Sequence, residues 1–279
     1  MKIFVRVLII VTVLIVIGVI AVLYAIYNSD SGQQDVQDEQ TFDEEIEDVE
    51  IEVDNARVEI LPSDDDTTRI TMTGNNDDFT LETDISGSRL QIEVEDRSPF
   101  FNFGFNRSYS LQVYIPENGL ASLTVNSDNG AIHAENIGAD EISIEADNGR
   151  IELEAVDSDT VNIETDNGRI ELRDMDANIS TRSSNGRIIF TGVSGELLAR
   201  ANNGRIELTT VILDSPVDFE TDNGSIEIRT VNEPDNARIE ADIDNGSINL
   251  YGQDTRQLSF GNGDVLIRLV SNNGRIVVE

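Results

Sequence analysis

The chain has 279 residues, with 54 acidic side chains against 19 basic ones, and a net charge of −35. The absence of cysteine excludes disulfides, thiolate metal sites and a cysteine nucleophile, and His133 is the only histidine. Nucleic-acid binding needs clustered Lys and Arg, so we expect no nucleic-acid partner.

Residues 7–27 contain no charged side chain and are about long enough to cross a bilayer as a helix. Lys2 and Arg6 precede this stretch, and acidic residues follow it. Because basic residues stay on the cytoplasmic side, we predict an anchor at 1–27 with a cytoplasmic N-terminus in the cell membrane and an extracytoplasmic remainder. A cleaved signal peptide is the alternative, although its apolar core is usually only about 7–15 residues long.

Residues 28–45 are polar and are predicted to form an acidic linker. From Asp30 to Asp54 there are 12 acids and no base. Such a segment is hydrated and repels itself, which favours an extended chain over a packed one.

Residues 46–118 contain strand-like runs in which apolar and polar residues alternate, at 49–53, 56–61, 69–74, 89–95 and 110–116. An aromatic segment interrupts them, comprising Phe100, Phe101, Phe103 and Phe105. It is interpreted either as a cap on the open end of a stacked fold or as an apolar patch that contacts a partner or the membrane.

Residues 119–279 form a repeat region. Asn-Gly pairs recur at intervals of 18 to 22 residues from Asn129 to Asn245, with further pairs at Asn262 and Asn273. The residue two positions before the Asn is small in seven of eight repeats. These positions are Ser127, Ala146, Thr165, Ser183, Ala201, Thr221, Ile243 and Ser271.

A period near 19 predicts an all-β fold built as a β-solenoid, with one two-strand coil per repeat over residues 46–279. In residues 160–178, Val161 and Ile163 share a face before the turn, and Ile170 and Leu172 share it afterwards. The alternative is an antiparallel meander or sandwich, since Asn-Gly also favours hairpins. Only the solenoid requires equivalent positions to meet from repeat to repeat. Asn and Gly are expected at the turns because both tolerate positive φ.

Stacked coils would align charged residues into an Asp row, an Arg row and a Glu row. The Asp that precedes the turn is a weak Ca²⁺ candidate, because carboxylates at loop corners bind calcium in some β-rolls. The candidates are Asp128, Asp147, Asp166, Asp222 and Asp244. Ser184, Asn202 and Asn272 replace this Asp in other repeats, so we favour turn chemistry and expect no cofactor.

Other candidate sites are poorly supported by the residues. Gly261-Asn262-Gly263 lacks the following helix that would hold a phosphate. His133 has no second histidine beside it, and carboxylate pairs are too common in this chain to single out a glycosidase couple. The strand-like run Arg275–Glu279 is expected to end in an exposed edge, which could pair end to end with a second copy.

The stretch VYIPENGLASLTVNSDNGAI at 113–132 and the repeats of the type DNGRIEL resemble the bacterial "putative adhesin" β-strand-repeat family, a domain of unknown function that includes LiaG-like envelope proteins. The resemblance covers roughly residues 46–279. It implies a solenoid-like envelope domain and carries over no catalytic residue.

These features together predict a membrane-anchored, non-enzymatic, adhesin-like or scaffold protein of the cell envelope. Its partner would be an envelope protein or a glycan. Two alternatives remain open, a carbohydrate-active β-helix lyase or hydrolase and a self-assembling envelope filament.

Overall fold

The computed structural model describes residues 35–74, 79–96, 109–116 and 119–279. The described residues form strands and connecting loops, and they contain no helix. The strands are β1 (Asp35–Phe42), β2 (Asp48–Pro62), β3 (Thr68–Gly74), β4 (Phe79–Ser86), β5 (Arg89–Asp96), β6 (Tyr109–Ile115), β7 (Leu120–Glu135), β8 (Ala139–Glu154), β9 (Asp157–Arg173), β10 (Asp176–Thr191), β11 (Leu197–Thr210), β12 (Val217–Thr230), β13 (Ala237–Leu250), β14 (Gln257–Ser259) and β15 (Val265–Val278).

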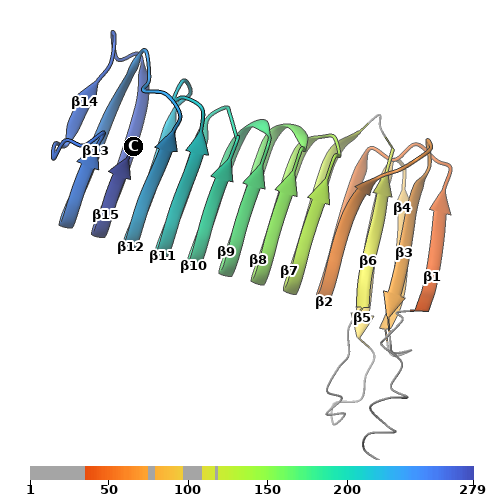
Figure 1. Cartoon of the computed structure of the whole chain (residues 1–279). Helices are drawn as coiled ribbons and strands as arrows, with labels where there is room; N and C mark the ends of the chain where they lie inside the picture. Colours follow the sequence, from red (N-terminus) through yellow and green to blue (C-terminus); the bar gives the residue numbers. More distant parts are fainter. Residues whose placement is uncertain (1–34, 75–78, 97–108, 117–118) are drawn as a thin grey trace, which may run out of the picture. The chain divides into compact units, whose positions relative to one another are not determined.

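Nine long strands lie side by side in the order β2–β7–β8–β9–β10–β11–β12–β15–β13 (Figure 1). Each pairs in parallel with the next, and every Asn-Gly pair in the stack meets the same pair of its neighbour, for example Asn148 with Asn167. This arrangement confirms the predicted stack of coils. It contradicts the hairpin meander, in which consecutive strands would run antiparallel.

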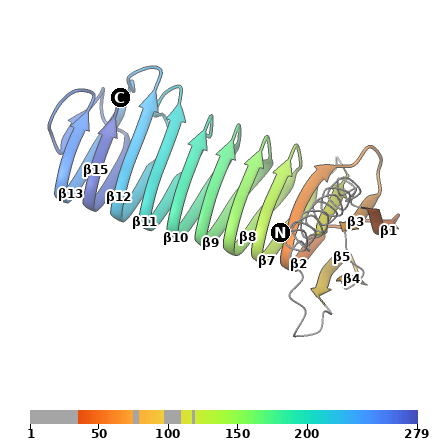
Figure 2. The same ribbon diagram turned by 60° about the horizontal axis from the view of Figure 1, so that its bottom comes forward.

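Each long strand bends at a corner, which is Asn-Gly in every strand of the stack from β7 to β13, into a first limb and a second limb (Figure 2). In β8, Ile142 and Ile144 of the first limb and Ile151 and Leu153 of the second limb are all buried. The alternation shifts by one residue at the corner, so both limbs turn their apolar side chains toward the same core. The small residues two positions before the corner Asn are buried there too, as Ser183 and Ala201 are.

The corner glycines are required by the close approach of consecutive coils. A Cβ on Gly149 would lie 1.8 Å from the carbonyl oxygen of Gly130, and one on Gly204 would lie 1.8 Å from that of Gly186. In the first long strand the corner is Asn55-Ala56, and an alanine fits because Ala56 faces Tyr109 of β6 rather than another corner. Because Asn55 is followed by alanine, the Asn-Gly repeat in the sequence does not include this corner.

The corner asparagines form a ladder of side-chain hydrogen bonds along the stack. The Nδ2 group of each donates to Oδ1 of the asparagine one coil nearer β2, at 3.0 to 3.1 Å. In stacking order the ladder runs through Asn55, Asn129, Asn148, Asn167, Asn185, Asn203, Asn223, Asn273 and Asn245. None of these asparagines has positive φ, so the expected reason for Asn is wrong. The side-chain amide, which both donates and accepts, explains it instead.

The strands before β7 extend the stack beyond β2 differently on its two limbs. β5 pairs with the first limb of β2 and β4 with β5, whereas β6 pairs with the second limb and β3 with β6. The strands expected at 49–53 and 56–61 are the two limbs of β2. Two strands were not predicted, β4 and also β1, which lies within the segment expected to be an acidic linker.

The C-terminal strand does not form the exposed edge that its sequence suggested. β15 inserts between β12 and β13 and pairs in parallel with both. β13 is therefore the last long strand, and β14 covers only residues Arg238–Glu240 of its first limb. Asn262 and Gly263 lie in the loop between β14 and β15, where Gly263 N donates to Phe260 O (3.1 Å), and do not form a corner.

Within the part of the chain that the structure describes, no helix is long and apolar enough to span a membrane. The predicted anchor at residues 7–27 lies outside that part.

Candidate interaction surfaces

The structure describes His133 but not the aromatic segment. Phe100, Phe101, Phe103 and Phe105 lie outside the described residues. His133 lies on the second limb of β7, where its Nε2 atom is 3.4 Å from Glu135 and its Nδ1 atom is 4.0 Å from Glu152. Its neighbours are thus two carboxylates.

The five aspartates proposed as weak calcium ligands follow the corner edge of the stack, and all are exposed. At two of the three positions where another residue interrupts the row, that residue donates to the neighbouring aspartate. Ser184 Oγ donates to Asp166 (3.0 Å), and Asn272 Nδ2 donates to Asp222 (2.9 Å). Among the described residues, His, Asp and Glu side chains form no group of three or more suited to hold a metal ion.

The second limbs carry the predicted arginine and glutamate rows side by side. Arg205 Nη1 lies 3.5 Å from Glu207 of its own strand, and Arg187 Nε on the neighbouring strand lies 3.4 Å from the same carboxylate. Exposed pairs of this kind are each worth about 0–1 kcal/mol. Their effect is to place opposite charges next to each other along a face that would otherwise be a column of acids.

Glu227 of β12 is the most enclosed carboxylate in these rows, at 5% exposure. Arg229 lies 2.7 Å away, Arg205 lies 4.0 Å away, and Arg275 of β15 donates a hydrogen bond to it. Burial acts to raise the pKa of Glu227, but the Arg275 hydrogen bond and the other guanidinium charges outweigh it and lower the pKa.

A second cluster joins three coils through Arg173 of β9. Its guanidinium contacts Glu171 of the same strand and Glu152 and Glu154 of β8. The hydrogen bond from Arg173 is the main reason that the pKa of Glu152 is lowered. His133 of β7 extends this cluster toward the N-terminal strands.

The first limb of β2 and strands β4 and β5 form a different surface, an open acidic groove of about 340 Å³. The acids that line it are Glu50, Glu52, Glu82, Asp84 and Glu93. Desolvation and then the charges of Glu52 and Glu95 raise the pKa of Glu93. The groove can attract cations, and it disfavours anionic ligands. The alternation of the sequence is enough to place Glu50 and Glu52 on one face of β2. The groove itself was not predicted, because β4, which supplies Glu82 and Asp84, was not recognised as a strand.

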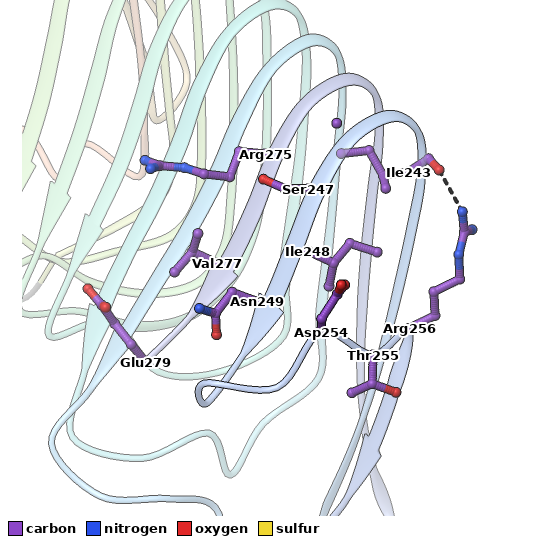
Figure 3. Close-up of a pocket in the computed structure, with 11 residues that line it drawn as sticks. Ile243, Ser247, Ile248, Asn249, Asp254, Thr255, Arg256, Arg275, Val277 and Glu279 are labelled. Atoms are coloured by element: carbon purple, nitrogen blue, oxygen red, sulfur yellow. Dashed lines mark hydrogen bonds between the residues drawn. The ribbon is translucent and has the colours of Figure 1, made fainter.

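A larger groove, of about 790 Å³, lies at the β13 end of the stack (Figure 3). Residues 246–249 of β13 and the outward side chains of β15 line it, together with the segment Asp254–Arg256. Arg256 Nη2 donates to the carbonyl oxygen of Ile243 (2.8 Å), which holds this segment against β13.

Several solved structures are similar to this chain. A "putative adhesin" of Bacteroides fragilis is similar over 89% of this chain and 100% of its own, at 13% identity and a TM-score of 0.52. A "putative adhesin" of Parabacteroides distasonis covers 89% and 98%, at 10% identity and a TM-score of 0.46. A "putative cell adhesion protein" of Clostridium sporogenes covers 86% and 98%, at 9% identity and a TM-score of 0.32. At 13% identity, the Bacteroides fragilis structure shows similarity of fold alone.

No curated protein matches the sequence. The model of the Toastrack DUF4097 family, a domain of unknown function, matches residues 46–279. This match includes every corner of the asparagine ladder, and the chain belongs to the Toastrack DUF4097 family.

Proposed function

We propose that the protein is a membrane-anchored, non-enzymatic scaffold of the cell envelope that binds an extended partner in the manner of an adhesin. The observation that carries this proposal is the in-register stack of nine corners, from β2 to β13. Because like positions repeat every coil, at about 4.8 Å, the second limbs offer rows of alternating charge along a rigid face. Such a face suits a long polymer or an extended protein surface.

The names of the similar structures and the apolar segment 7–27 support the same proposal from independent directions. The N-terminal anchor would place the domain outside the membrane, where the strong negative charge keeps it hydrated. The partners that a domain at this location would encounter are envelope glycans and envelope proteins.

The experiment is a retention assay of the full chain, in detergent, on isolated envelope glycan and on immobilised envelope proteins. In one variant, Arg169, Arg187 and Arg205 of the second limbs are changed to Gln. In the matched control, Arg182, Arg200 and Arg238 of the first limbs are changed to Gln. We expect the first variant to lose retention and the control to keep it. Equal retention by the wild type and both variants would contradict a role for the second-limb rows.

A carbohydrate-active enzyme is the second candidate, favoured by the acidic groove in which the pKa of Glu93 is raised. A carboxyl group with a raised pKa next to an ionised one is the arrangement that glycoside hydrolysis uses. Incubation of the chain with envelope glycans, followed by measurement of new reducing ends, separates the candidates. Turnover that disappears in Glu93→Gln would replace the scaffold proposal.

A further inference from the structure

The second limb of β13 is an uncovered strand edge. Tyr251 N donates to Val278 O of β15 at 2.7 Å, so odd-numbered positions of this limb face β15. The backbone groups of Gly246 and Ile248 therefore point to the opposite side. Leu250 pairs there with Gln253, and β14 covers only the first limb. Among the described residues, the backbone groups of Gly246 and Ile248 have no partner on that side.

The same limb lacks the charges that usually protect an edge. Its five residues, Gly246–Leu250, include no charged side chain and no proline. Ser247 occupies the position of Arg275 in β15, and Asn249 the position of Val277. The second limbs of the other eight long strands carry Arg, Glu or His. Natural edges are normally blunted by charge, proline or a bulge, so an edge that is both uncovered and uncharged is suited to strand addition.

The surroundings of this edge leave room for an added strand. The 790 Å³ groove runs beside residues 246–249, and the segment Asp254–Arg256 forms its far wall (Figure 3). Ile248 is 8% exposed, the highest exposure among the core isoleucines. A strand in the groove would complete the backbone hydrogen bonds and cover this side chain.

We propose that the occupant is the same edge of a second copy, paired antiparallel about a two-fold axis at Ser247. In this register, Gly246 and Ile248 lie opposite the partner's Ile248 and the partner's Gly246. Residues that are opposite in such a pair exchange both backbone bonds, so all four free groups on each side are satisfied. Each Ile248 side chain meets a glycine, which leaves it room.

The charge distribution favours a second copy paired in this way. In a chain with a net charge of −35, self-pairing of most strands would oppose like charges, which is destabilising. Here the residues that pair, Gly246–Ile248, are uncharged, and the charged side chains that line the groove are of both signs, Asp254 and Glu279 with Arg256 and Arg275. β1, at the opposite end of the sheet, carries Asp35, Asp38 and Glu39 and is unsuited to pairing with itself. Pairing of β13 with β1 of another copy would leave edges open and produce chains longer than a dimer.

The dimer is expected to strengthen with salt. Only a short edge is buried, while two strongly acidic bodies approach each other. Added salt shortens the screening length to about 8 Å at 0.15 M, so repulsion between the bodies falls and the neutral contact persists. This dependence does not involve the envelope partner, and it holds or fails independently of the scaffold proposal.

Cysteine cross-linking of the full chain in mild detergent tests the register. The protein has no cysteine, so Ser247→Cys introduces a single thiol. Across the two-fold axis the Cα atoms of a non-hydrogen-bonded pair would be about 4.5 Å apart, within disulfide range. We expect oxidation to give a disulfide-linked dimer. Ser225→Cys is the matched control, because Ser225 has the same place in β12, inside the stack. Equal cross-linking of the two variants, or no dimer from Ser247→Cys, would overturn the proposal.

Sedimentation of the full chain tests the same contact without a new bond. The wild type is expected to form a dimer and no larger species, and Ser247→Lys, which sets like charges across the axis, to weaken the dimer by about tenfold or more. Ser225→Lys should dimerise like the wild type. Growth beyond a dimer would show head-to-tail pairing and refute the two-fold arrangement. A wild type that stays monomeric at high salt would refute it as well.

Discussion

Glu227 of β12 and Glu93 of β5 are both glutamates of paired strands, yet their pKa values move in opposite directions. Glu227 is surrounded by three arginines, which lower its pKa despite burial. Glu93 is surrounded by Glu52, Glu82 and Glu95, which add to desolvation and raise its pKa. The repeat stack thus balances Glu227 with arginine, whereas the groove of the N-terminal strands sets Glu93 among like charges.

The corners differ between the same two regions. In the stack from β7 to β13, every corner has glycine next to the ladder asparagine. At β2 the corner has Ala56, because β6 follows on that side rather than another coil. The regular stack is therefore fixed by backbone contact, and the N-terminal strands can vary more. Four predictions, each with a control substitution, test the differences between the two regions in corners and in charge.

The largest effect is expected from Gly204→Ala. The added Cβ would lie 1.8 Å from the carbonyl oxygen of Gly186, so two neighbouring coils must separate. Overpacking of this kind costs about 3 kcal/mol or more when backbone must move. Thermal unfolding followed by circular dichroism measures the loss. In the control, Ala56→Gly, we expect a loss of only about 0.5–1 kcal/mol. Similar losses at the two corners would contradict the role assigned to coil contact.

Loss of one ladder residue is expected to depend on its place in the ladder. Asn185 accepts a hydrogen bond from Asn203 and donates one to Asn167, whereas Asn245, the last in the ladder, makes only one. At about 0.5–1.5 kcal/mol per bond, Asn185→Ala should cost about 1–3 kcal/mol and Asn245→Ala about half as much. Chemical denaturation of the two variants measures the ratio. Equal losses would show that the ladder bonds contribute little.

Much of the stack could be predicted from the sequence because its signals are local and repeated. The period near 19, the alternation around Ile163 and the small residue before the corner all depend on near neighbours along the chain. The hydrogen-bond ladder was not predicted, because an asparagine at a turn can be required either for its backbone conformation or for its side-chain amide. The sequence alone does not distinguish these two roles. Ala155, with φ of 51°, lies in the bend between two coils, where no glycine marked the turn.

The chain order of the last coils could not be predicted from the repeat. Strands β13 and β15 have the same corner sequence type, and only their tertiary pairing puts β15 next to β12. The chain between Asn245 and Asn273 is longer than the chain between the other consecutive Asn-Gly corners, because it contains β14 and the loop through which the chain returns to β12. This longer spacing was the sequence signal that could have indicated the changed strand order. Because β15 inserts between β12 and β13, the uncovered edge belongs to β13. The prediction placed this edge on the C-terminal strand, because that strand comes last in the sequence.

Glu227→Gln tests the arginine-rich side of the comparison. The amide keeps the shape but loses the charge that three guanidinium groups contact, and we expect a loss of about 1.5–3 kcal/mol at pH 7. Because the folded-state pKa is lowered, the stabilisation by Glu227 is complete above its usual value of 4.5 and is lost as the pH falls through the folded-state pKa. Denaturation at pH 7 and below pH 4.5 measures both effects.

The control for this substitution is Glu207→Gln, in the same row but with looser contacts, at 3.4 and 3.5 Å. A smaller loss is expected there. If the difference between wild type and Glu227→Gln stays constant through the acid range, the charge of Glu227 is not the cause of the loss.

The smallest effect, and the one of opposite sign, is expected from Glu93→Gln. Folding raises the pKa of Glu93, so its charged form opposes folding at neutral pH, and that penalty disappears as the pH falls below its usual value of 4.5. The variant should therefore unfold at a slightly higher temperature than the wild type at pH 7 in low salt. The gain should vanish at acid pH and shrink in high salt, where the field of Glu52 and Glu95 is screened. Glu240→Gln, which removes a partner 2.9 Å from Arg238, should give no gain. A gain from both substitutions would mean that net charge alone, rather than the opposed acids of the N-terminal strands, sets the effect.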